Sequence, residues 1–199
     1  MRYRYLTIER EYGSGGTEIA EALSKALDIP CYGHEILEMT CERLGISEEK
    51  LAKYEETATN SFLFSVFMMS NSAAGRPDAV AGEGQIYLAE QAVIRDLAAQ
   101  GPAIFIGHCA SEVLRGAKGV ANVFIRADKA YKKARILNGY GIDERNVEST
   151  RKYFDKKRAN YYYANTARRW DDLGGYDLVL DSGKLGTAGC VAALAGLMK

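Results

Sequence analysis

The sequence predicts an α/β protein of three layers, with a central parallel sheet of about five strands and helices on both faces. Short apolar runs of strand length alternate with segments in which apolar residues recur every three or four positions, as in helices. The apolar run 103–107 is continuous, which is typical of a strand buried on both faces of a parallel sheet. Ligands of such sheets lie at the carboxyl ends of the strands, so the functional site is expected there.

The first part of the chain contains two expected strands, at 3–9 and 29–32. Between them, the spacing of apolar residues predicts a helix over 15–28 that follows a glycine-rich turn directly. A second helix is expected at 34–44, where apolar residues share one face and a glycine follows. A further helix is expected to begin at Ser47, a typical N-cap residue.

Residues 57–84 do not fit one element. The run 62–69 is too apolar to face solvent, whereas 71–82 is rich in Ala, Gly, Ser and Asn and has no periodicity. One interpretation is a mobile flap over a pocket or a dimer contact, which leaves a homodimer possible. The other is a core helix followed by a surface loop.

The second half alternates again. Gly101 and Pro102 mark a clear helix end before the buried run. The expected elements are a helix at 85–100, a strand at 103–107, a short helix up to Leu114, a strand at 120–125, a helix at 128–139, a strand at 176–181 and a last helix with Val191, Leu194 and Met198 on one side.

Composition indicates a single domain, 1–199, in the cytoplasm. The 26 basic residues equal the 26 acidic ones, so no general attraction to nucleic acid or to an anionic membrane is expected. No signal peptide is recognised, and no apolar run approaches the roughly 20 residues of a membrane-spanning helix. Four widely spaced cysteines without a C-x-x-C pair are interpreted as reduced thiols: Cys31, Cys41, Cys109 and Cys190.

The glycine-rich turn after the first strand is the candidate phosphate-binding site. Glycines allow a tight turn, and the helix that follows adds the positive end of its dipole. The usual phosphate-loop signature is G-x-x-x-x-G-K-[ST]; Gly15 and Thr17 match it, whereas Gly16 replaces the lysine and Arg10 the first glycine. The alternative is an ordinary strand-to-helix turn.

The segment 140–172 is the most charged part of the chain, with basic residues interleaved with acidic and aromatic ones. An arginine-bearing lid for phosphoryl transfer would have this composition, because cations around the migrating group stabilise the transition state. A solvated helix face with i,i+4 pairs, such as Arg151 with Asp155, is the second interpretation. A surface for a single nucleic-acid strand is the third.

Six short motifs in the same order give the chain a resemblance to the cytidylate kinase-like family of bacterial P-loop proteins. They lie at 9–16, 29–32, 106–110, 123–127, 155–162 and 176–178, so the resemblance covers nearly the whole chain.

The resemblance implies a P-loop kinase fold with an acceptor-binding or flap region at about 34–84 and a lid at about 140–172. It also implies transfer of the terminal phosphate of ATP, with Mg²⁺, to a nucleotide such as CMP or dCMP. Partners would then be small-molecule nucleotides.

Carried over by position, the resemblance implies roles for individual residues. Lid arginines are Arg158 and Arg151, and Asp155 orients the lid. Arg10, Lys184 or a lid arginine replaces the charge of the missing lysine. The donor nucleotide is bound by Gly13, Ser14, Gly15, Gly16 and Thr17, with Thr17 also on magnesium, and by Lys184 near the base.

Three acceptor-side positions depart from the family pattern. Gly33 stands where an aspartate is usual, and His108 and Ser111 stand where an arginine and an aspartate are usual. His108 either binds an acceptor phosphate when protonated or is a neutral, hydrogen-bonded histidine at a strand end. Two functions therefore stay open: an ATP-dependent nucleotide kinase, and a non-catalytic nucleotide-binding sensor.

Overall fold

A parallel five-stranded sheet forms the centre of the molecule in a computed structural model, which describes residues 3–47 and 83–198. The strand order is β2-β3-β1-β4-β5, and all paired strands are parallel. This confirms the predicted fold class. The strands are β1 (Tyr5–Arg10), β2 (Cys31–Tyr32), β3 (Ala103–Ile106), β4 (Val120–Arg126) and β5 (Leu178–Asp181).

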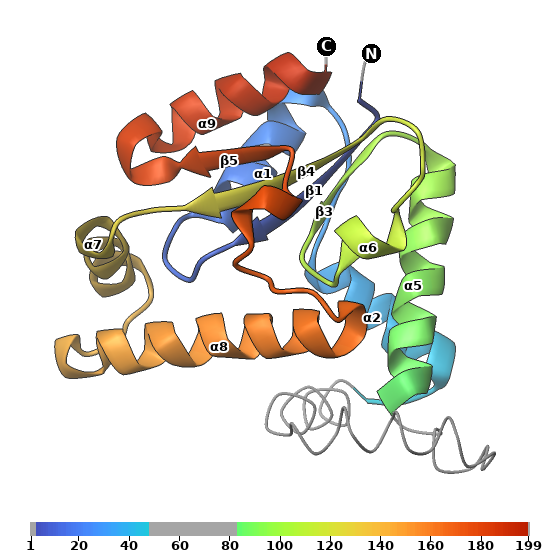
Figure 1. The fold of residues 1–199 in the computed structure, drawn as a ribbon, viewed down its shortest axis with the longest axis horizontal. Coiled ribbons are helices and arrows are strands. Elements are labelled where there is room, and N and C mark those ends of the chain that lie inside the picture. Colours follow the sequence, from blue (N-terminus) through green and yellow to red (C-terminus); the bar gives the residue numbers. More distant parts are fainter. Residues whose placement is uncertain (1–2, 48–82, 199) are drawn as a thin grey trace.

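Helices cover both faces of the sheet (Figure 1). They are α1 (Gly16–Leu27), α2 (His34–Leu44), α5 (Glu83–Gln100), α6 (Ala110–Val113), α7 (Lys129–Gly139), α8 (Val147–Thr166) and α9 (Ser182–Met198), with short 3₁₀ turns η2 (Glu144–Asn146) and η3 (Leu173–Gly175). Among the described residues, no helix has the length and apolar character needed to cross a membrane.

The core divides at the sheet. On one face, α1 and α9 pack through Leu23 and Leu194 against Leu6 and Ile8 of β1. The opposite face carries α5 and α6, packed around Phe105. Alternate residues of a strand point to opposite faces, so β1 is buried on both sides, and so is β3, as its continuous apolar run predicts.

Several boundaries differ from the sequence prediction. The first strand extends to Arg10, which pairs with Ile125 and brings the Arg10 side chain to the carboxyl edge of the sheet. The last strand begins only at Leu178. The last helix is interrupted at Gly186, whose φ of 65° lies outside the helical region. The helix expected at Ser47 and nearly all of 57–84 lie outside the described residues.

Two further predictions concern cysteines and the charged segment. All four cysteines are free thiols. Within the charged segment 140–172, most residues form α8, which runs along the same side of the sheet as α6 (Figure 1). The aromatic side chains Tyr162 and Trp170 pack beneath it against Phe124 of β4.

Candidate active site

The glycine-rich turn joins β1 to α1 at the carboxyl edge of the sheet, where the fold class predicts a ligand. Gly13 and Gly15 have φ values of 82° and 78°, in the left-handed region that favours glycine. A Cβ atom on Gly13 would lie 3.0 Å from the Ile136 side chain, so α7 packs directly on this turn. Ser14 closes the turn, because its hydroxyl donates a hydrogen bond to the Glu11 carbonyl at 2.8 Å.

The first turn of α1 presents the remaining loop residues. Gly16 is buried, whereas Thr17 is exposed on the helix surface. The first N–H groups of a helix have no acceptor within the helix, and the dipole makes this end positive. The structure thus brings the five predicted loop residues, 13–17, to one helix N-terminus that suits an anion.

Glu11 anchors the loop to α7. Its Oε2 accepts hydrogen bonds from the Ala127 backbone N–H at 3.1 Å and from the Lys132 ammonium at 2.7 Å. Lys132 is buried, with 4% of its side chain exposed. Removing Glu11 would leave the buried Lys132 ammonium without its ion-pair partner, which strongly destabilises a folded protein. The sequence predicts this helix at 128–139 but does not reveal the role of Lys132.

A second cation from α7, Arg135, lies over the loop. A Cβ atom on Gly15 would lie 3.0 Å from the Arg135 guanidinium carbon. The same guanidinium donates to a Glu18 carboxylate oxygen at 2.7 Å, and that carboxylate raises its pKa against the effect of burial. Arg135 could have been identified from the order of elements, because α7 follows the fourth strand and therefore begins at the same edge of the sheet as the loop.

The predicted lid residues lie on α8, docked on the backbone of the loop. Asp155 accepts a hydrogen bond from the Tyr12 N–H at 2.6 Å, and Arg158 donates one to the Arg10 carbonyl at 2.9 Å. Arg151 pairs with Asp155 at 3.1 Å, as the i,i+4 interpretation predicts. The helix therefore carries both the expected i,i+4 pair, which is mostly buried, and two contacts to the loop.

Burial changes the acidity of these groups. It raises the pKa of Asp155, although the Tyr12 N–H and the Arg158 charge act in the opposite direction. It lowers the pKa of Arg158, which keeps its charge near neutral pH because guanidinium groups lose protons only in strong base.

Behind the loop lies a group of buried carboxylates that the sequence did not reveal. Glu9 of β1 accepts a hydrogen bond from the Trp170 indole at 3.0 Å. Glu90 of α5, 1% exposed, accepts one from the Tyr161 hydroxyl. His108 lies with Nδ1 3.5 Å from a Glu90 oxygen, in a turn where its φ is 54°. This histidine thus faces a carboxylate at the end of β3.

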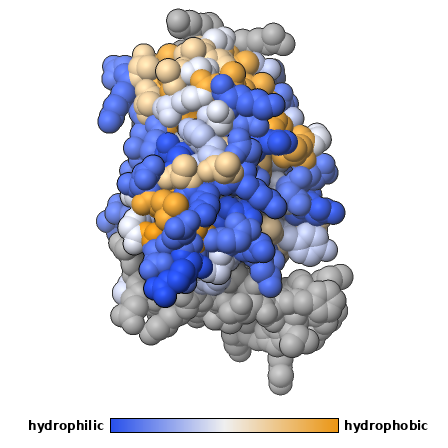
Figure 2. Space-filling view, turned by 90° about the vertical axis from the view of Figure 1, so that its left-hand side faces the viewer, coloured by the Kyte–Doolittle hydropathy of each residue, from blue (hydrophilic) through white to orange (hydrophobic). Residues whose placement is uncertain are grey.

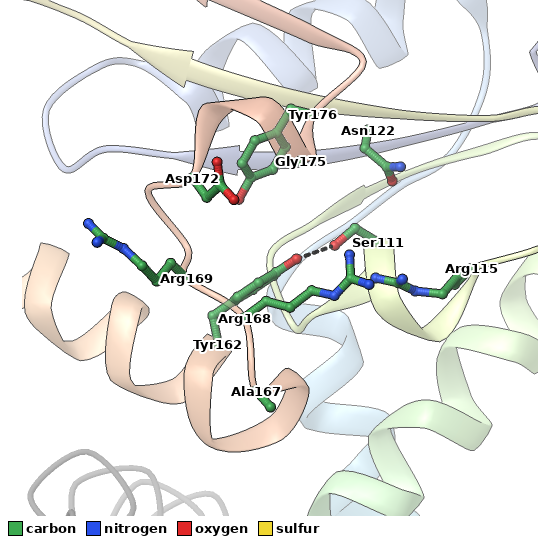
Figure 3. A pocket seen from close by; sticks show the side chains of 10 residues that line it. All are labelled: Ser111, Arg115, Asn122, Tyr162, Ala167, Arg168, Arg169, Asp172, Gly175 and Tyr176. Carbon is green, nitrogen blue, oxygen red and sulfur yellow. Dashed lines mark hydrogen bonds between the residues drawn. The ribbon is translucent and has the colours of Figure 1, made fainter.

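Ser111, the second acceptor-side residue, lines a cavity of about 350 Å³ between α6, the end of α8 and the segment before β5 (Figure 3). Its hydroxyl lies 3.2 Å from the Tyr162 hydroxyl. Arg115 and Arg168 reach this cavity, and both pair with the Glu112 carboxylate. Arg169 pairs with Asp171, and Asp172 adds a further carboxylate to the lining, so the charges around the cavity are largely balanced within the protein.

Residues after β5 also reach the loop. The buried Ser182 hydroxyl donates to the Ser14 carbonyl at 2.6 Å, which ties the start of α9 to the turn. Lys184, the predicted base-side residue, is exposed two positions further on. Figure 2 shows the end of the molecule where α7 lies, and its surface is mostly hydrophilic, as a site for a charged ligand requires.

Comparison with protein-family models matches residues 5–184 to the cytidylate kinase-like family. Comparison with curated protein sequences finds no match.

Comparison with solved structures finds P-loop kinases. An uncharacterized protein from Eubacterium ventriosum superposes with a TM-score of 0.70 at 24% identity, over 96% of each chain. The shikimate kinase from Bacteroides thetaiotaomicron gives 0.56 at 12% identity, covering 98% of this chain and 97% of its own. A gluconokinase from Sinorhizobium meliloti gives 0.51 at 16%, covering 100% and 94%. At these identities the similarity establishes the fold.

Proposed function

The chain belongs to the cytidylate kinase-like family, and from this premise we propose that it is a kinase that transfers the terminal phosphate of ATP to a nucleoside monophosphate, with cytidylate as the preferred acceptor. The observation that carries the proposal is the docking of α8 on the glycine loop, through Asp155 on the Tyr12 N–H and Arg158 on the Arg10 carbonyl. Arginines held beside a phosphate loop are what phosphoryl transfer requires.

The donor phosphates would bind at residues 13–17. Two left-handed glycines and a helix N-terminus favour an anion there, and a Cβ atom on Gly15 would intrude on the Arg135 guanidinium. Exposed Lys184, at the carboxyl end of β5, would lie near the donor base.

The arginines of α8 would act on the group in transfer. Arg158 and Arg151 would hold its oxygens, since a loose transition state spreads negative charge over them. Asp155 would act as a positioning residue, because it contacts both the loop backbone and Arg151.

Magnesium fits as an ion bound mainly through substrate phosphates. Mg²⁺ is usually held by one or two protein oxygens together with phosphates and water, and Thr17 offers an exposed hydroxyl on the first turn of α1. The described residues contain no group of three potential ligands that could hold a metal ion alone. When bound, the ion would neutralise charge on the phosphate oxygens.

The alternative function is nucleotide binding without transfer. His108 lies beside the Glu90 carboxylate with 14% of its side chain exposed, so the charge of a protonated imidazole there would be compensated within the protein. An acceptor phosphate would gain less from such a histidine than from an unpaired arginine.

Phosphate transfer from labelled ATP with Mg²⁺ to a panel of nucleoside monophosphates, nucleosides and sugar acids tests the proposal. ATP binding measured by calorimetry in the same buffer is the control. Transfer to CMP or dCMP supports the proposed acceptor. Transfer only to another compound overturns the acceptor, and binding without any transfer favours the sensor.

A further inference from the structure

Arg10 occupies space that two glycines leave open. A Cβ atom on Gly16 would lie 2.5 Å from the Arg10 Cβ, and one on Gly107 would lie 2.6 Å from Arg10 Nη1. The side chain therefore runs from the end of β1 past the first turn of α1 to the turn after β3. A side chain at either glycine would collide with it.

The guanidinium of Arg10 forms no ion pair with a described residue, although the charge of Glu9 acts to raise its pKa. Its Nε is buried without a hydrogen-bond partner, and no carboxylate of residues 3–47 or 83–198 lies within ion-pair distance of it. Burial and the neighbouring Arg158 charge lower the pKa of Arg10 to about 10, so the group stays protonated at neutral pH. An unpaired, largely buried cation is unfavourable in the unliganded protein.

The two cations of α7 beside the loop are different. Lys132 is paired with Glu11 and Arg135 with Glu18. Their charges are explained by contacts within the fold. Arg10 has no such structural partner, although it lies at the same sheet edge as the glycine loop.

We propose that the Arg10 guanidinium binds a phosphoryl group of the nucleotide and takes the place of the lysine that the usual signature has at position 16. Gly16 is then required because a side chain there would fill the path of Arg10. The inference rests on the proposed function and deepens it, since it names the residue that recognises the phosphate. A planar guanidinium can hold two phosphate oxygens at once.

The test compares the wild type with Arg10→Met, Gly16→Lys and the double variant Arg10→Gly/Gly16→Lys, which restores the usual signature. Arg43→Met is the matched control, because Arg43 pairs with Asp96 between α2 and α5. The measurements are calorimetric affinity for ATP and for inorganic pyrophosphate, and the midpoint of thermal unfolding without ligand. Neither depends on phosphate transfer.

Arg10→Met is expected to weaken ATP and pyrophosphate binding by about 10- to 100-fold, the usual range for losing a hydrogen-bonded charge. Its unliganded midpoint should equal or exceed that of the wild type, because an unpaired cation is removed. Gly16→Lys alone should lose both stability and affinity, and the double variant should regain both. Arg43→Met should bind as the wild type does.

Unchanged affinity in Arg10→Met would overturn the inference, and so would a fall in its unliganded midpoint, which would show that Arg10 is structural. A wild type that binds ATP but transfers no phosphate would contradict the kinase alone, leaving Arg10 to be judged by binding. A wild type that binds neither ATP nor pyrophosphate would overturn both.

Discussion

The backbone conformation of single residues shapes the glycine-rich loop. Gly15 has a φ of 78°, and a side chain there would also press on the Arg135 guanidinium. Replacing glycine by another residue at a left-handed position costs about 1–2 kcal/mol, even before the contacts of the new side chain are considered. This loop is thus restricted by the backbone and by a neighbouring side chain.

Gly15→Val is therefore expected to abolish detectable ATP binding while the protein remains folded. Calorimetry gives the affinity, and circular dichroism checks the fold. Gly139→Ala is the matched control, because no atom lies within 4 Å of its added Cβ. Affinity of Gly15→Val equal to that of the control would contradict the assignment of the loop to phosphate.

Among the described residues, Arg158 donates one hydrogen bond, from Nη1 to the Arg10 carbonyl, and its guanidinium lies over the Tyr12 ring. Its other donors are available to a ligand, so Arg158→Ala should lower kcat by on the order of 1,000-fold, as arginines on a transferring phosphate do. ATP affinity should fall far less. Steady-state kinetics gives kcat, and calorimetry gives the ATP affinity. Arg158→Lys should show an intermediate loss of kcat. Equal losses of kcat and of ATP affinity would argue against a role in transfer.

At the scale of the element, α8 is joined to the loop by Asp155, Arg158 and ring stacking. The Tyr12 and Phe154 rings stack with centroids 4.6 Å apart. Because these contacts come from one helix face, movement of α8 would alter the loop and the arginines together. Substrate closure of a lid commonly acts in this way.

The raised pKa of Asp155 predicts how stability depends on pH. Its folded pKa lies above the ordinary value of 3.8, so the folded state binds the proton more tightly than the unfolded state. This difference leaves the free energy of unfolding unchanged below pH 3.8 and lowers it as the pH rises from there through the folded pKa. Asp155→Asn should therefore gain stability relative to the wild type as the pH increases from acidic to neutral.

Urea unfolding at several pH values measures this difference. Asp171→Asn is a suitable control, because an arginine hydrogen bond lowers the pKa of that exposed carboxyl. If the stability of Asp155→Asn relative to the wild type falls as the pH rises, the ion pair of Asp155 with Arg151 stabilises the charged carboxylate more than burial destabilises it.

The elements were largely predictable because their signals are local. Periodicity located the strands and helices within a few residues, and glycines located the loop. The break at Gly186 was missed, since an isolated glycine in an apolar helix does not by itself specify a left-handed φ.

The partners around the loop were not predictable from local pattern. Trp170 reaches Glu9 across 161 positions, and Lys132 reaches Glu11 across 121. Sequence reasoning recognised Arg10 and Gly16 as departures from the signature, yet only the fold shows that one occupies the space left by the other. Tertiary contacts, rather than propensity, decide such pairs.

At the scale of the whole molecule, the parallel sheet places the carboxyl ends of β1, β3, β4 and β5 at one edge. The candidate residues come mainly from the ends of these strands and the segments that follow them. The same edge thus unites the loop, two helices rich in cations and the turn at His108. Ligands of doubly wound sheets lie at this edge, so a single nucleotide could contact all of these segments at once.

Phosphorus-31 NMR of the wild-type protein mixed with Mg-ATP and CMP tests the central claim most directly, because it identifies every phosphorus-containing product. Phosphoryl transfer predicts that ADP and CDP form in equal amounts while little free phosphate appears. Persistence of ATP and CMP, or formation of ADP with free phosphate and no CDP, would contradict cytidylate phosphorylation.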